Sequence, residues 1–260
     1  MQSIVKRWLG RKDAGDAFLP PKVEPGRRVY CVGDIHGRVD LLQELHGRIK
    51  ADAANYDGEK QVVYLGDVID RGMYSCEVVD ELLGSPLAGF ESIYLLGNHE
   101  QTLLDFLQHP KIAAGWLSWG GRETLLSYGV ELPLNLTRVE IPLIRDDLEN
   151  RLPEKHMKFY QDMQLMHIAG DYLFVHAGIR PGKPIQEQSN EDLLWIRQDF
   201  TESRLRHDYV VVHGHTISDE VEFLPNRIGI DTGAYQTGIL SCLVLEGEEK
   251  RLLQTGDESG

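Results

Sequence analysis

Cysteine, basic residues and long apolar runs are all scarce in this sequence of 260 residues. Its three cysteines, Cys31, Cys76 and Cys242, are too few and too scattered for a disulfide framework or a cysteine-rich zinc site. No stretch approaches the roughly 20 apolar residues of a membrane-spanning helix, and the first residues lack the apolar core and cleavage site of a signal peptide. We therefore expect a cytoplasmic protein with no membrane partner.

Acidic residues outnumber basic ones, with 41 Asp and Glu against 27 Lys and Arg and a formal net charge of −14. A nucleic-acid surface needs clustered positive charge, so this balance argues against a nucleic-acid partner. An anionic substrate would have to be attracted by local cations, either metal ions or a few specific arginines.

The length fits one sizeable domain. Residues 1–26, which mix charges with several Pro and Gly residues, are predicted to be an N-terminal extension, and the acidic residues 248–260 a frayed tail. Between them, short apolar runs alternate with helical periodicity, which predicts a helix over 40–54 among others. Such alternation is typical of an α/β fold, so we predict a single domain over 27–247.

Residues 110–160 carry no motif typical of a metal site and hold Trp116 and Trp119 in a region that favours helix and loop. We interpret this segment as an insertion that packs beside the site. Because tryptophan buries a large area, both side chains are expected in the core rather than on a substrate platform.

Three polar signatures lie in the first hundred residues, each directly after a short apolar run typical of a buried strand. They are Gly-Asp-x-His-Gly at 33–37, Gly-Asp-x-x-Asp-Arg-Gly at 66–72 and Gly-Asn-His-Glu at 97–100. Successive motifs are about 30 residues apart, the length of one βαβ unit. Their polar side chains should therefore meet at the carboxyl ends of neighbouring strands, where open α/β sheets bind ligands.

The second half of the chain repeats this pattern, because His176, His215 and Asp231 also follow apolar runs. The candidate metal ligands are Asp34, His36, Asp67, Asn98, His176 and His215. Such a set is too large for one ion but fits two that share a carboxylate. One ion would take Asp34, His36 and Asp67, and the other Asp67, Asn98, His176 and His215.

Ligands of mixed nitrogen and oxygen type suit two divalent metal ions. Mn²⁺ is the metal that we expect, with Fe or Zn²⁺ as the alternatives. Two such ions would activate a water for attack on a phosphoester. Taken alone, Asp34 could be a turn residue and His176 a core histidine. Five such clusters, each after an apolar strand, favour a shared metal site instead.

Together, the motifs resemble those of the phosphoprotein phosphatase family of serine/threonine phosphatases, over about 27–247. The resemblance is closest to the bacterial branch, which is similar to the bacteriophage lambda phosphatase and to symmetrical diadenosine tetraphosphate hydrolases. It implies a calcineurin-like metallophosphoesterase fold, an α/β architecture of two packed mixed β-sheets flanked by helices. The dimetal site would lie at the C-terminal ends of the strands, with Asp67 bridging.

The same resemblance implies roles for four further residues. His99 would protonate the leaving oxygen, while Asp70 holds its imidazole. Arg71 would clamp the phosphoryl oxygens. Arg197, which follows an apolar segment ending in tryptophan, would be a second phosphate ligand. The longer C-terminal portion and docking surfaces of the eukaryotic members are missing here, so no regulatory subunit is inferred.

Three functions are compatible with these residues. The first is dephosphorylation of phosphoserine and phosphothreonine in proteins or peptides, by attack of a hydroxide that bridges the two ions and with His99 as general acid. The second keeps the site and changes the substrate to a dinucleoside polyphosphate, as in a symmetrical diadenosine tetraphosphate hydrolase, or to another small-molecule phosphoester. Trp116, Gly120-Gly121 and Thr124-Leu125 resemble a segment of the tetraphosphate hydrolases. The third is a metal-binding sensor without chemistry, which predicts a damaged ligand set that this chain does not show. Family analogy favours the first.

Overall fold

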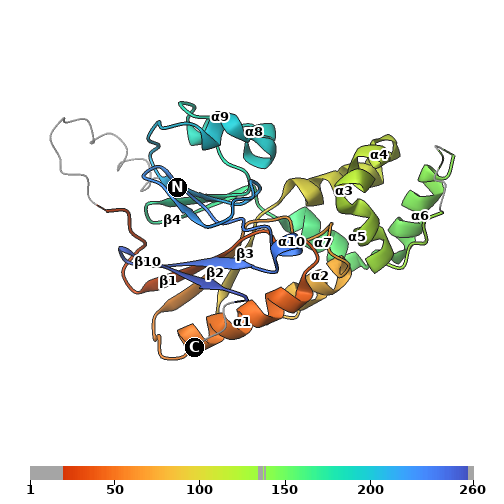
Figure 1. The fold of residues 1–260 in the computed structure, drawn as a ribbon. Helices are drawn as coiled ribbons and strands as arrows, with labels where there is room; N and C mark the ends of the chain where they lie inside the picture. Colours follow the sequence, from red (N-terminus) through yellow and green to blue (C-terminus); the bar gives the residue numbers. More distant parts are fainter. Residues whose placement is uncertain (1–19, 134–136, 138, 257–260) are drawn as a thin grey trace, which may run out of the picture.

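The computed structural model describes residues 20–133, 137 and 139–256, which contain two five-stranded β-sheets packed against each other (Figure 1). In the first sheet the order is β10-β9-β1-β2-β3. The strands β1 (Arg27–Val32), β2 (Glu59–Tyr64) and β3 (Glu91–Tyr94) are parallel. The strands β9 (Ser241–Glu246) and β10 (Glu249–Gln254) form an antiparallel hairpin beside β1.

The second sheet has the order β4-β5-β6-β8-β7. Its central strands β5 (Tyr172–Val175), β6 (Val210–His213) and β8 (Arg227–Gly229) are parallel. The edge strands β4 (Met166–Ala169) and β7 (Glu222–Phe223) run antiparallel to their neighbours. Two packed mixed sheets were predicted from the sequence, and this prediction is confirmed.

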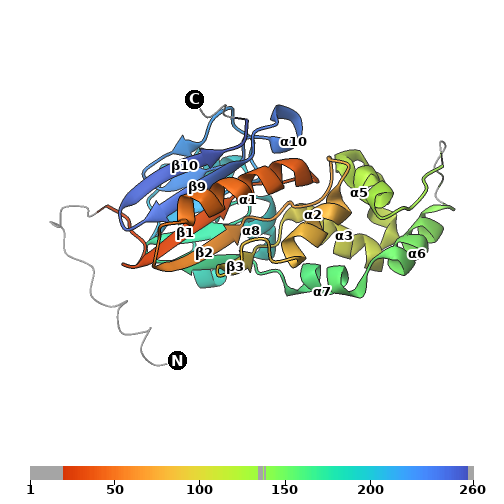
Figure 2. The same cartoon turned by 90° about the horizontal axis from the view of Figure 1, so that it is seen from below.

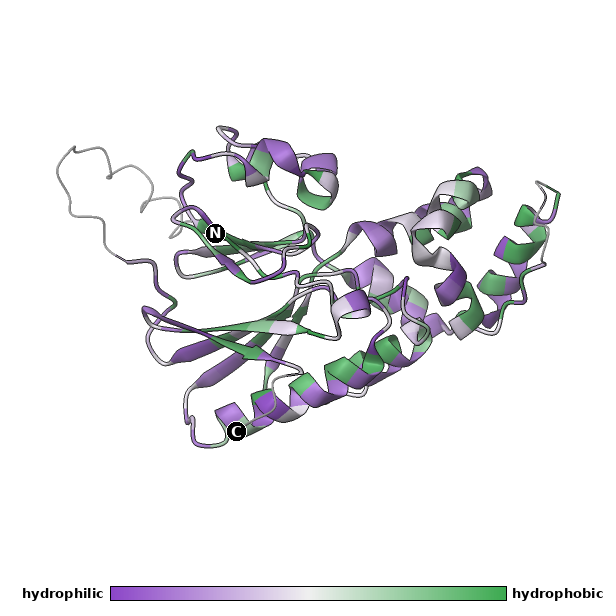
Figure 3. Cartoon of the chain, viewed as in Figure 1, coloured by the Kyte–Doolittle hydropathy of each residue, from purple (hydrophilic) through white to green (hydrophobic). Residues whose placement is uncertain are grey.

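Helices cover the outer face of each sheet. The helix α1 (Val39–Ala53) lies along the first sheet, as the view from below shows (Figure 2), and α2 (Ser75–Leu83) packs beside α1, toward the other helices. The helices α8 (Asn190–Trp195) and α9 (Gln198–Thr201) lie on the second. Hydrophobic and hydrophilic residues alternate along α1 (Figure 3), in line with the periodicity that predicted a helix over 40–54.

Alternation along β1 explains why the sheets stack. Val29 and Cys31 point into the core between the two sheets, where they join Phe174 of the second sheet. Tyr30 and Val32 point the other way, into the core under α1 and α2. Because successive side chains of a strand face opposite sides, one apolar run serves two cores.

The remaining helices gather mainly at one end of the molecule, beyond the carboxyl ends of the parallel strands of the first sheet (Figures 1 and 2). They are α3 (Asn98–Gln108), η2 (Pro110–Ile112), α4 (Ala113–Trp116), the π-helical turn η3 (Leu117–Gly121), α5 (Arg122–Ser127), α6 (Ile141–Arg151) and α7 (Glu154–Asp162). Two short helical turns lie elsewhere, η4 (Ile185–Glu187) and α10 (Ala234–Thr237). We call α3 to α7 the helical lobe.

The helical lobe contains the predicted insertion, and its two tryptophans differ. Trp116 is fully buried, as expected, whereas Trp119 leaves 47% of its surface exposed, so the expectation for Trp119 was wrong. Trp119 lies within the π-helical turn η3, which starts directly after Trp116.

The predicted frayed tail at 248–260 is wrong for 249–254, which form β10. Its charged residues resemble a tail, but they lie on an edge strand that pairs along its whole length with β9. At the other end, Val23 of the predicted extension is buried, and its N–H donates to Gly247 O at 3.0 Å. Residues 1–19 and 257–260 lie outside the described part of the chain. None of the described helices combines the length and apolar character needed to cross a bilayer.

Candidate metal centre

The loops after the strands bring two groups of possible metal ligands together. His36, Asp67 and His99 form one group, and Asp67, His176 and His215 form the other. Within each group the ligand atoms lie within 4.8 Å of one another. Asp67 belongs to both groups, which is the arrangement expected of a carboxylate that bridges two ions.

Two of the six predicted ligands stand beside these groups. Asn98 Oδ1 lies 2.9 Å from His176 Nε2, at the second group. Asp34 accepts a hydrogen bond from the backbone N–H of His215 through Oδ2 at 3.0 Å, while its buried Oδ1 has no partner among the described residues. His99, predicted as the acid, lies in the first group where Asp34 was expected. The structure thus gathers all six residues, and their role as ligands stays a prediction.

Backbone hydrogen bonds orient the histidine rings. His36 Nδ1 lies 2.8 Å from Ile69 O, and His176 Nδ1 lies 2.8 Å from Leu65 O. A carbonyl can only accept, so each Nδ1 carries the proton and each Nε2 keeps its lone pair for the cluster.

The backbone of the site is held in the left-handed region. In the described part of the chain, six residues other than glycine have positive φ, and five of them are site residues. These five are His36, Asp67, Asp70, Arg71 and His215, with φ between 46° and 69°. Each costs on the order of 1–3 kcal/mol, so the surrounding structure must enforce a conformation that serves the site.

A close approach explains Gly214. A Cβ placed on this residue would lie 2.0 Å from Asp34 Oδ1, and the carboxylate is held there by the His215 N–H, which donates to its other oxygen, Oδ2. Only glycine lets the loop after β6 come this close to the carboxylate of the loop after β1.

The protonation states and unpaired polar atoms of the cluster suit the binding of cations. Burial lowers the pKa of His36 to about 3 and that of His215 to about 2, so both imidazoles are neutral, the form that can bind a metal ion. Burial raises the pKa of Asp34 well above its usual range. Buried carboxylates beside neutral imidazoles, with Asp34 Oδ1 and His215 Nε2 left without hydrogen-bond partners in the described chain, fit divalent metal ions.

Glu100 holds the loop that carries Asp67. Its fully buried carboxylate accepts from the backbone N–H groups of Asp67 at 2.9 Å, Val68 at 2.8 Å and Gly97 at 3.0 Å. Glu100 is the last residue of the Gly-Asn-His-Glu motif, but the sequence analysis gave it no role. Its place in that motif was the sequence feature from which a structural role could have been predicted.

His99 and Asp70 form the predicted pair at the edge of the cluster. His99 Nδ1 lies 2.6 Å from Asp70 Oδ2. Burial alone would lower the pKa of His99, but the carboxylates of Asp67 and Asp70 outweigh it and raise the pKa above its usual value. The helical lobe supplies two further donors to the Asp70 carboxylate, Trp116 Nε1 at 2.9 Å and Thr124 Oγ1 at 2.5 Å.

Two arginines face the cluster without a carboxylate partner. Among the described residues, neither Arg71 nor Arg197 forms an ion pair, although the chain as a whole is strongly acidic. Arg71 Nη2 lies 3.3 Å from His99 Nε2, and its guanidinium lies 4.7 Å from the ring centroid of Tyr235. Arg197 donates to His215 O at 3.3 Å. Both predicted phosphate ligands are therefore free to meet an anion.

Asp231 is a buried carboxylate that the sequence analysis noted after a strand but left without a role. It follows β8, and its Oδ1 accepts from the N–H of Gly233 at 2.9 Å. Burial raises its pKa to about 6, and it interacts electrostatically with Asp34. The shared pattern of apolar strand then aspartate, seen at Asp34 and Asp67, was the signal for it.

Comparison with known proteins agrees with this geometry. The family model for the calcineurin-like phosphoesterases matches residues 27–238. The chain belongs to this family. It is a metallophosphoesterase, and its His and Asp clusters fit the divalent metal site of the family.

Curated relatives cover most of this phosphoesterase. The bis(5'-nucleosyl)-tetraphosphatase PrpE, asymmetrical, of Bacillus thuringiensis (strain Al Hakam) is 24% identical over 232 residues, which is 82% of this chain and 88% of that protein. The protein of the same name from Anoxybacillus flavithermus is 28% identical over 233 residues, with the same coverage.

Solved structures support the fold. A crystal structure described provisionally as a diadenosine tetraphosphatase has a TM-score of 0.60, at 22% identity, and covers 91% of this chain and 98% of its own. The cold-active protein-tyrosine phosphatase of a psychrophile, Shewanella sp., has a TM-score of 0.53, at 18% identity, over 90% of this chain and 83% of its own. At these identities the likeness shows the fold alone.

Proposed function

We propose that this metallophosphoesterase hydrolyses dinucleoside polyphosphates. The observation that carries the proposal is the pair Arg71 and Arg197, two cations without carboxylate partners in the described chain, beside the ligand cluster of a protein with net charge −14. A polyphosphate spreads several negative charges along a chain, so it can meet both guanidinium groups and the metal ions at once. A monoester offers a single phosphoryl group to the same cations.

The named relatives support the same substrate class. Two of them, 24% and 28% identical across 82% of this chain, bear the name bis(5'-nucleosyl)-tetraphosphatase. These names move the preference away from a serine/threonine protein phosphatase, which family analogy had favoured. We expect the asymmetrical cut, which releases ATP and AMP from diadenosine tetraphosphate.

Each side chain at the site has a separate proposed role in cleaving the phosphoanhydride bond. The two groups of candidate ligands that share Asp67 would hold divalent ions, which would activate a water as the nucleophile and screen the phosphate charge. His99, whose Nδ1 lies 2.6 Å from Asp70 Oδ2, would give a proton to the leaving oxygen through Nε2. This nitrogen lies 3.3 Å from Arg71 Nη2, beside the place proposed for the phosphoryl oxygens. Arg71 and Arg197 orient the phosphates and stabilise the charge that spreads over them.

A charge-removal series tests the proposal. Arg197→Gln should raise KM for diadenosine tetraphosphate about tenfold, the usual worth of a hydrogen bond to a charged group, and Arg197→Lys should restore part of it. Arg180→Gln is the matched control, because Asp192 at 2.9 Å and Asp199 already neutralise Arg180. Chromatography of the wild-type products should show ATP and AMP. No turnover of the dinucleotide would overturn the proposal.

The second candidate remains hydrolysis of phosphoserine or phosphothreonine, with a phosphoprotein or phosphopeptide as the partner. The motif resemblance supports it, since His99, Asp70 and both arginines would serve a monoester as well. Faster turnover of a phosphothreonine peptide than of the dinucleotide by the Mn²⁺-loaded protein would favour it.

A further inference from the structure

Two tryptophans meet beside the metal cluster, from opposite parts of the fold. Trp119 comes from η3 of the helical lobe, and Trp195 ends α8 on the second sheet. Their ring centroids lie 5.7 Å apart with the planes tilted by 60°. The ring of Trp195 lies 6.4 Å from that of His215, a predicted metal ligand. The pair therefore joins the helical lobe to the second sheet at the rim of the site.

The core does not account for this aromatic pair. Trp119 leaves 47% of its surface exposed, whereas Trp116, three residues earlier, is fully buried. Among the described residues neither Trp119 nor Trp195 has a hydrogen-bond partner for its indole N–H, while Trp116 donates to Asp70. An exposed indole face beside a phosphate site is a surface on which a flat ring can stack.

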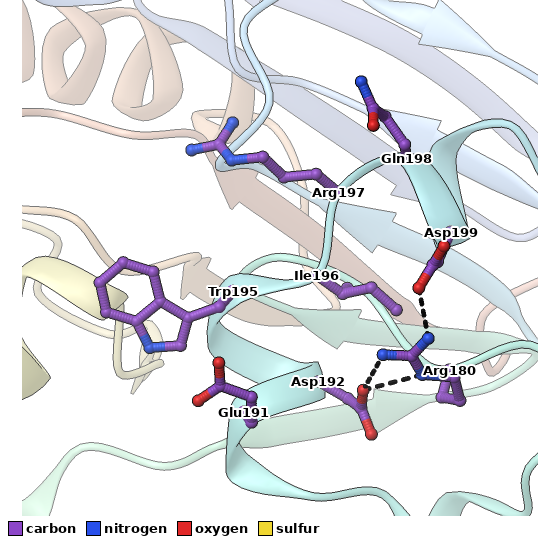
Figure 4. A pocket seen from close by; sticks show the side chains of 8 residues that line it. All are labelled: Arg180, Glu191, Asp192, Trp195, Ile196, Arg197, Gln198 and Asp199. Carbon is purple, nitrogen blue, oxygen red and sulfur yellow. Dashed lines mark hydrogen bonds and ion pairs between the residues drawn. The ribbon is translucent and has the colours of Figure 1, made fainter.

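One pocket is lined by both the aromatic ring of Trp195 and the cationic side chain of Arg197 (Figure 4). Its volume is about 290 Å³. The side chains of Trp195 and Arg197, two residues apart, project from the backbone to the same side. The guanidinium of Arg180 is tied to Asp192 and Asp199, so its charge is neutralised. Arg197 is thus the lining cation that can meet phosphate, and Trp195 the adjoining surface that suits an uncharged ring.

We propose that Trp119 and Trp195 form a nucleobase subsite, on which one base of the substrate stacks while its phosphates lie against Arg71 and Arg197. This inference rests on the proposed function and names what recognises the nucleoside. A nucleobase is planar, polarisable and uncharged, so an acidic surface does not repel it. The exposed carboxylate of Glu191, in the same pocket, offers an acceptor for the exocyclic amino group of adenine.

A matched pair of ligands isolates the contribution of the base. Isothermal titration of the Mn²⁺-loaded protein would compare α,β-methylene-ADP with methylenediphosphonate, which carries the same P–C–P group without a nucleoside. Trp119→Ala should weaken binding of the ADP analogue roughly tenfold or more and leave the affinity for methylenediphosphonate within about twofold. Trp119→Phe, which keeps a stacking ring, should recover most of the loss. Trp195→Ala should act in the same direction.

Phe223→Ala is the control for removing an exposed aromatic ring. Phe223 is also 47% exposed but lies on the edge strand β7. This variant should bind both ligands as the wild type does. Equal loss of both ligands in Trp119→Ala would mean that the tryptophan only supports the fold, and no loss of either would remove it from recognition. Both results overturn the proposal.

A peptide ring is the competing occupant. If Trp119→Ala weakened binding of a phosphonate analogue of phosphotyrosine and left the ADP analogue unaffected, the pair would recognise a tyrosine ring, and the nucleobase proposal would be wrong. The titration needs no turnover, so its failure is distinct from failure of the proposed function. A protein that discriminates the ADP analogue through Trp119 yet does not cleave dinucleotides would refute only the latter.

Discussion

The indole Nε1 of Trp116 donates a 2.9 Å hydrogen bond to Asp70 Oδ2, the oxygen that also lies 2.6 Å from His99 Nδ1. A residue of the helical lobe therefore holds the carboxylate that orients the predicted acid. The sequence alone favoured a core position for Trp116, and the side chain is indeed fully buried. The same buried position that packs Trp116 in the core also brings its indole N–H to the predicted catalytic pair.

Removing that single hydrogen bond should slow the chemical step. Trp116→Phe keeps an aromatic ring against Phe106, whose centroid lies 4.8 Å away, but removes the donor to Asp70. We expect kcat to fall about tenfold with KM within about twofold, because the lost bond to a charged group acts on the acid and not on substrate binding. Tyr172→Phe is the control for losing a buried aromatic donor, since the Tyr172 hydroxyl donates to Pro21 O at 3.1 Å and has no contact with Asp70. Equal rates for wild type and Trp116→Phe would contradict the positioning role.

The acid itself should be separable from the metal site. His99→Asn should keep the fold and the bound metal and lower kcat by roughly 10²–10⁴-fold, the usual contribution of a general acid. Steady-state rates and metal content by mass spectrometry check this. Because His99 also lies in the first group of possible ligands, loss of metal in this variant would assign it to coordination instead.

The bridging assignment of Asp67 has a direct consequence for stoichiometry. Asp67→Asn removes a charge from the one residue that both groups share. We expect bound metal to drop from about two ions per chain to one or fewer. Thr102→Ser, a conservative change at a buried residue of α3 that keeps the hydroxyl bonded to Asn98 O at 2.7 Å, should retain full occupancy. Full occupancy in Asp67→Asn would refute the bridging role.

Gly214 should be required for metal binding and activity, but not for folding of the chain. In Gly214→Ala the new Cβ would collide with Asp34 Oδ1, so the carboxylate must move. Metal affinity or activity should fall roughly 10–100-fold, as for other disturbed ligand supports. Gly47→Ala, in an exposed turn of α1 with no atom within 4 Å of the added Cβ, should instead stabilise the protein by roughly 0.5–1 kcal/mol and leave metal binding unchanged. Unaltered metal binding in Gly214→Ala would show that Asp34 is not held as described.

Local patterns in the sequence were enough to predict the strands, the helices and the candidate ligands that the structure gathers at one place. Alternation in β1 and helical periodicity in α1 are properties of neighbouring residues, and each predicted ligand directly follows an apolar run. Edge strand β10 escaped prediction because its charged residues resemble a tail, and only pairing with β9 makes them a strand.

Contacts between distant residues could not be predicted. Trp116 is 46 positions from Asp70, and no periodicity links them. Trp119 lies within η3, where Gly120 adopts φ 112° and its carbonyl accepts from the N–H of Arg71 at 3.2 Å. A Cβ at Gly120 would lie 2.4 Å from that nitrogen, so glycine allows the lobe to contact the loop that carries Arg71.

A competition assay tests the central claim most directly. Mn²⁺-loaded protein would receive diadenosine tetraphosphate and a phosphothreonine peptide at equal concentration in one reaction, so that the ratio of their rates of consumption equals the ratio of their kcat/KM values. The account predicts that the dinucleotide is consumed at least about tenfold faster, with ATP and AMP as products. Preferential consumption of the peptide would contradict it and make this phosphoesterase a protein phosphatase.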